Sequence, residues 1–225
     1  MKKQLYYPLV ISATGTEVYP VLGEEDHGMP YVFDFSADNP DVDTYDTLNY
    51  VKFQEQIQFE LERSGKKWGI GRYLEKRDGI LRSFPQMMDQ KRFYHVGLDV
   101  VVGELVPLHA PIDGTVYQIG FDSGQGNYGR YLILRHQISG VVFYSFYGHL
   151  DAKIPLQQGD KVLSGQIIAY TGKEEDSGGW FSHLHLQILT ERAVHEGLIH
   201  TGYVDQDFLS QINDYFPSPY TLLAY

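Results

Sequence analysis

The chain reads DVVV at residues 99–102, GTVYQIG at 114–120, RYLILRH at 130–136, VVFYSFYG at 141–148, QIIAYTG at 166–172 and HLHLQIL at 183–189. These short runs, rich in β-branched and aromatic residues, decide the fold. Turn dipeptides such as Asp113-Gly114 and Gly178-Gly179 stand near their boundaries, and no amphipathic helix of ordinary length fits between them. The pattern predicts a mainly β fold, an antiparallel sheet or sandwich-like arrangement rather than alternating β-α-β units.

The first part of the chain has a different character. We place a boundary near residue 90, in the polar stretch MMDQKRF, and expect an N-terminal α+β extension over residues 1–90 and a β-rich domain over residues 91–225. One helix is predicted in the extension, over about residues 47–64, with Asp46 as its cap and Gly65 at its end. Its apolar stripe consists of Tyr50, Phe53, Ile57 and Leu61.

The composition excludes several classes of function. A formal net charge of −11 argues against a nucleic-acid partner, because that affinity depends on lysine and arginine neutralising phosphates. The chain has no cysteine, so a metal would be held by histidine, aspartate or glutamate. No run approaches the roughly 20 apolar residues of a membrane span, and Pro8 interrupts the short apolar stretch near the N-terminus. We therefore expect a cytoplasmic location by default, with a periplasmic or extracellular one as the alternative.

Three histidines have positions that suit a site. His183 and His185 are two residues apart in a predicted strand, so both imidazoles point to the same face while Leu184 points to the core. They can share a metal or divide the work, one binding the ion and the other facing its open side. His149 follows the apolar run VVFYSF and Gly148, where a strand that ends at glycine would bring the side chain into a cleft.

His95 and Asp99, in the run HVGLD, form a second pair. On a straight strand they would lie about 13 Å apart, too far to share one ion. Gly97 between them permits a bend or bulge that brings both side chains together. A hydrolytic zinc site needs three protein ligands and one open position, and Asp99 with two histidines supplies that number. The remaining histidines would transfer protons.

These segments, together with PLHAPIDGTV (107–116), YGHLD (147–151) and GDKVLSGQIIAYTG (159–172), resemble the LytM/lysostaphin-type zinc metallopeptidases over about residues 94–189. The resemblance implies the duplicated hybrid motif fold and endopeptidase cleavage of peptidoglycan peptides by a metal-activated water. Ser182 departs from the family, which usually has proline before the H-x-H motif. The resemblance further implies one zinc ion per chain held by His95, Asp99 and His185, and catalytic roles for His149 and His183.

Two other functions would use part of the same pattern. A non-catalytic peptidoglycan-binding or regulatory module of the same fold has no need of three intact ligands and two further histidines. Phosphotransfer through histidine would leave Asp99 without a role. The other histidines are expected to be ordinary surface or core residues, and these are His27, His109, His136, His195 and His200.

Overall fold

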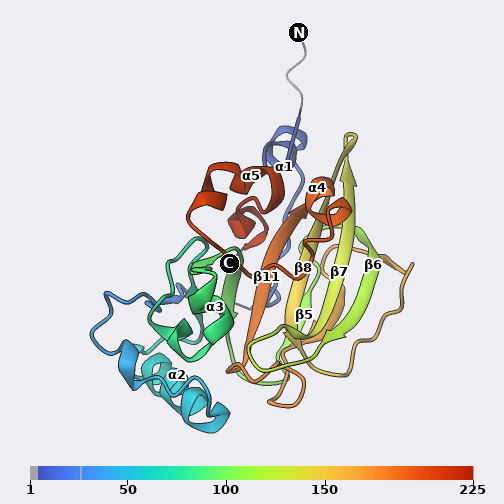
Figure 1. Ribbon diagram of the computed structural model, residues 1–225. Helices are drawn as coiled ribbons and strands as arrows, with labels where there is room; N and C mark the ends of the chain where they lie inside the picture. The colour runs from blue at the N-terminus through green and yellow to red at the C-terminus, as the bar shows by residue number, and fades with distance from the viewer. Residues whose placement is uncertain (1–4, 26, 225) are drawn as a thin grey trace.

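The computed structural model describes residues 5–25 and 27–224, and one large β-sheet dominates it (Figure 1). Eight strands lie in the order β1-β2-β4-β11-β8-β7-β6-β9. Every neighbouring pair is antiparallel except β1 and β2, which confirms the predicted mainly β, antiparallel fold. The strands are β1 (Tyr31–Phe33), β2 (Gly69–Gly71), β4 (Leu98–Val101), β6 (Gly114–Asp122), β7 (Gly129–Ile138), β8 (Val141–Leu150), β9 (Lys161–Val162) and β11 (His183–Thr190).

Both faces of this sheet are covered. On one face, β5 (Pro107–His109) and β10 (Ile167–Tyr170) form a two-stranded sheet that shares a core with β7 and β11. On the other face, α4 (Glu191–His195) and α5 (Ile212–Tyr215) pack on β7 and β8. Burial on both faces explains why β8 is largely apolar instead of alternating. A second short pair joins β3 (Tyr94–His95) to β12 (Tyr203–Val204).

The helices differ in part from the prediction. The helix α2 (Tyr50–Ser64) ends at Gly65 as predicted, but it begins at Tyr50 because the side chain of Asn49, not Asp46, accepts the hydrogen bond from the Lys52 amide. The prediction of one helix before residue 90 was wrong. Two more, α1 (Leu9–Thr14) and α3 (Pro85–Asp89), are too short to show helical periodicity. Among the described residues, no helix is long and apolar enough to cross a membrane.

The N-terminal segment extends the large sheet at one edge. Strand β2 pairs with β4, and α2 and α3 lie on the side of β11 away from β6 (Figure 1). An aromatic cluster joins this segment to the loop before β11, with ring centroids 4.9 Å apart for Phe53 and Phe181 and 5.4 Å apart for Phe84 and Trp180. The predicted domain boundary near residue 90 stays a prediction.

Candidate metal centre

Three side chains that are distant in the sequence converge in the interior. His95 Nε2 lies 3.0 Å from His185 Nδ1, and Asp99 Oδ1 lies 3.3 Å from each of these nitrogens. Ligand atoms about 2.0–2.1 Å from a tetrahedral zinc ion lie about 3.3 Å from one another. The triangle therefore has the size that zinc requires, and all three side chains are buried.

The strand pairing brings these residues together. Strands β4 and β11 pair so that Asp99 stands opposite His185, and His95 ends β3 just before a bend that leads into β4. The sequence predicts this bend at Gly97, but the main role of that glycine is to leave room for the imidazole ring of His185. A Cβ atom at Gly97 would lie 2.9 Å from Nδ1 of His185 and closer still to Cε1 and Nε2. Glycine therefore lets the chain pass directly against the imidazole.

Hydrogen bonds determine which ring nitrogens carry protons. His95 Nδ1 lies 3.2 Å from the carbonyl oxygen of Arg72, which can only accept, so Nδ1 donates. His185 Nε2 likewise donates to Gln187 Oε1 at 2.9 Å. The facing atoms, His95 Nε2 and His185 Nδ1, are therefore unprotonated. Two nitrogen lone pairs and a carboxylate meet at one point, an arrangement that a bound cation would stabilise.

The protonation states also suit a metal. Burial and the charge of Arg77 lower the pKa of His95 to about 3. Burial by itself would raise the pKa of Asp99, but the nearby charges, above all that of Arg77, hold it well below the usual range. Burial also lowers the pKa of His149 well below its usual value. At neutral pH the site thus offers a neutral His95 imidazole and an ionised Asp99 carboxylate to a metal, with a neutral His149 beside them.

His149 and His183 lie beside the triangle, with their ring centroids 4.3 Å apart. His149 Nδ1 donates to the carbonyl oxygen of Ser177 at 2.7 Å, and His183 Nδ1 donates to that of Phe181 at 2.8 Å. In the neutral form of either ring, Nε2 is then the unprotonated nitrogen. His183 Nε2 lies 3.5 Å from Asp99 Oδ1, next to the candidate metal position.

The backbone at His149 is unusual. The sequence suggested a strand end at Gly148, but β8 continues to Leu150, and the pairing of β7 with β8 shifts register at this point. His149 has a left-handed φ of 60°, which is rare for a residue with a side chain and is concentrated at functional sites. The irregularity directs the imidazole of a buried strand toward the site.

The five side chains line one cavity of about 260 Å³. Part of its wall comes from residues before the predicted boundary, among them Arg77, Ile80 and Met87. Aromatic and polar side chains from the β-rich part complete it, among them Trp180, Tyr203, Arg92, Asp122 and Asn127.

Several residues of the site were missed by the sequence analysis. Arg77 donates to Asp99, Gln187 orients His185, and Tyr203 packs against His95. Gln187 could have been found, because it lies two residues after His185 in β11 and therefore on the same face of the strand. No local motif connects Arg77 or Tyr203 to the ligands that they contact, because only the fold brings them together. Of the histidines expected to be ordinary, His136 is buried and His200 is exposed at the cavity wall.

Comparison with known proteins identifies the segment that carries the site. Residues 93–196 match peptidase family M23. An uncharacterized metalloprotease of Haemophilus influenzae is 36% identical over 101 residues, which are 44% of this chain and 20% of that protein. The chain therefore matches only a small part of that relative's length.

Solved structures of peptidases are also similar. The catalytic domain of the antimicrobial peptidase lysostaphin from Staphylococcus simulans is 25% identical, with a TM-score of 0.40 over 52% of this chain and 80% of that one. A zinc-containing peptidase from Vibrio cholerae is 29% identical, with a TM-score of 0.35 over 44% of this chain and 28% of that one. All five predicted site residues fall within the matched segment. The match to peptidase family M23 thus covers the whole candidate metal centre.

Proposed function

We propose that the protein is a zinc metallopeptidase that hydrolyses peptide bonds. The proposal is carried by one observation, the convergence of two unprotonated imidazole nitrogens and a carboxylate oxygen at the separations of zinc ligands. Three ligands leave a tetrahedral ion one position for water or substrate, as in hydrolytic rather than structural zinc sites. The match of this segment to a peptidase family supports the reaction class.

His95, Asp99 and His185 would hold the ion. When bound, zinc lowers the pKa of a water toward about 7 and polarises the scissile carbonyl group. His149 and His183 both line the same cavity. One of them accepts the proton of the attacking water at Nε2, and the other, in its protonated form, donates to the developing oxyanion or to the leaving amine.

Backbone carbonyl groups hold the rings of His149 and His183 in one orientation. The carbonyl oxygens of Ser177 and Phe181 accept the Nδ1 protons and prevent either ring from turning over. They also stabilise a ring that has become protonated at both nitrogens, because a carbonyl dipole attracts the added charge. The pair therefore cycles between neutral and charged forms without changing its orientation.

We further propose that the substrate is a stem or cross-link peptide of peptidoglycan. The cavity fits a peptide in its chemistry, since Trp180 and Met87 offer apolar contact while Asn127 and Arg92 offer polar groups. The resemblance to LytM/lysostaphin-type peptidases and the match to family M23 support this substrate class. An acidic chain also suits a peptide ligand better than a polyanion.

The experiment is a hydrolysis assay on purified peptidoglycan peptides, with products identified by mass. We expect one zinc ion per chain by elemental analysis, and products that disappear with a chelator and return with added zinc. His183→Ala should abolish the products, whereas His195→Ala, at an exposed position outside the cavity, should not. Absence of a stoichiometric divalent metal would contradict the proposal, and zinc without turnover would instead indicate a binding module.

A further inference from the structure

The N-terminal segment places a buried cation against one metal ligand. Arg77 Nη1 donates to Asp99 Oδ2 at 2.6 Å, while Asp99 Oδ1 faces His95 and His185. The two oxygens of the carboxylate are thus divided, one for the arginine and one for the metal position. Arg77 and Asp99 are each 2% exposed, so solvent does not screen the pair.

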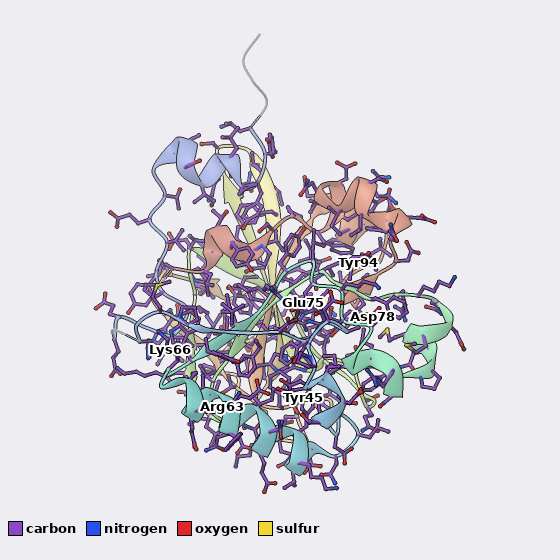
Figure 2. All side chains as sticks on the ribbon, turned by 90° about the vertical axis from the view of Figure 1, so that its left-hand side faces the viewer. Tyr45, Arg63, Lys66, Glu75, Asp78 and Tyr94 are labelled. Atoms are coloured by element: carbon purple, nitrogen blue, oxygen red, sulfur yellow. The ribbon has the colours of Figure 1, made fainter. Side chains whose placement is uncertain are left out.

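Arg77 is itself fixed by a second carboxylate. Its Nε donates to Glu75 Oε2 at 2.9 Å. The other oxygen of Glu75 accepts from the Arg72 guanidinium at 2.7 Å and from the Phe35 amide at 3.3 Å. The Arg77 guanidinium also lies over the Phe35 ring, 5.0 Å from its centroid. Glu75, labelled near the middle of the view in Figure 2, is itself buried.

The edge of the sheet leaves room for this pair. Gly71 in β2 stands opposite Asp99 in β4. A Cβ atom at Gly71 would lie 2.6 Å from Arg77 Nη2 and 3.0 Å from Asp99 Oδ2. Any side chain at this position would therefore collide with the ion pair. The N-terminal segment thus supplies both the arginine and the space for it.

We infer that Arg77 is a positioning residue for the metal ligand Asp99, so that the segment before residue 90 completes the zinc site. With Oδ2 bound to the guanidinium, the carboxylate cannot rotate, and Oδ1 stays at the corner of the ligand triangle. Groups that orient a ligand in this way typically contribute about 10–100-fold in metal affinity. The inference rests on the proposed function in taking zinc as the ion.

The test compares Arg77→Met, Arg77→Lys and wild type, with Arg82→Met as the matched control. Arg82 belongs to the same segment, but its side chain is 51% exposed and pairs with Asp43 at the surface. Zinc affinity is measured by competition with a chelating dye, and the cobalt(II) spectrum reports ligand geometry. We expect zinc affinity to fall about 10–100-fold in Arg77→Met and by less in Arg77→Lys, with an altered cobalt spectrum in both. Arg82→Met should match wild type.

Lysine keeps the charge but lacks the forked guanidinium whose Nε and Nη1 reach Glu75 and Asp99 at the same time. An Arg77→Lys protein with wild-type zinc affinity and cobalt spectrum would therefore overturn the inference, even if Arg77→Met failed to fold. A folded Arg77→Met protein with wild-type affinity would overturn it as well. Failure of the wild-type protein to bind zinc would instead refute the proposed function, which keeps the two outcomes distinct.

Discussion

Replacing Gly97 with alanine should damage the metal site through one methyl group. The residue has no left-handed φ, so alanine introduces no backbone strain there. The new Cβ atom would nevertheless lie 2.9 Å from His185 Nδ1 and closer to two other ring atoms. Non-bonded carbon atoms normally stay about 3.5–4.0 Å apart, and His185 Cε1 is the closest ring atom, so the imidazole must retreat by roughly 1 Å or more.

Two quantities follow from this displacement. Overpacking of a filled interior costs about 1–3 kcal/mol, and each kcal/mol lowers the melting temperature by about 2–4 °C in a protein of this size. The apo protein should therefore melt about 2–12 °C lower. Metal–ligand distances tolerate only about 0.2 Å, so a retreat of His185 should also weaken zinc binding by about 10–100-fold.

Gly103→Ala is the matched control. Gly103 has no left-handed φ either, and no atom lies within 4 Å of its added Cβ. We would measure thermal unfolding of the apo proteins and zinc affinity by dye competition. Gly103→Ala should match wild type in both. The steric reasoning fails if Gly97→Ala binds zinc as tightly as Gly103→Ala.

Three further perturbations test other parts of the structure. His149→Ala and His183→Ala should keep stoichiometric zinc by elemental analysis but lose about 10²–10⁴-fold in hydrolysis rate, and loss of zinc would argue against their assignment. Ser182→Pro removes the amide that donates to Gln54 Oε1 at 2.6 Å, so urea unfolding should show a loss of about 1–3 kcal/mol, and an unchanged midpoint would contradict this. Burial lowers the pKa of His136 to about 4, so between about pH 6.5 and pH 4 the unfolded chain binds a proton that the folded one does not. The free energy of unfolding should therefore decrease as the pH is lowered across that window, by up to about 1.4 kcal/mol per pH unit. His136→Asn should make this dependence on pH weaker, and equal slopes in the two proteins would refute the assignment.

The β-rich part was predictable because its strands are long and apolar. Runs such as RYLILRH and VVFYSFYG became β7 and β8, since both are buried on both faces and carry few polar interruptions. The short helices α1 and α3 were not predictable, because five or six residues give no periodicity. The start of α2 was misplaced because Asn49 and Asp46 are equally good caps by residue type, and only the fold selects between them.

The same contrast applies to the site. Two histidines two residues apart on a strand must share a face, so the orientation of His183 and His185 followed from local geometry. His95 and Asp99 required a bend that Gly97 made plausible. Arg77 gave no such signal, because its link to Asp99 spans 22 positions and arises from contact between the segment before residue 90 and β4.

Ser182 connects the N-terminal segment to residues 93–196, the part of the chain that matches the peptidase family. The resemblance leads one to expect proline before His183, and proline has no amide proton. Here Ser182 donates its amide proton to Gln54 on α2, immediately next to Phe181, whose carbonyl oxygen holds His183. The N-terminal segment thus contacts the site at several points: through Gln54 at the loop that orients His183, the proposed proton-transfer histidine, and through Arg72 and Arg77 at the proposed zinc ligands His95 and Asp99. Proline at position 182 could not donate this hydrogen bond, so serine is the residue that allows α2 to hold the loop beside His183.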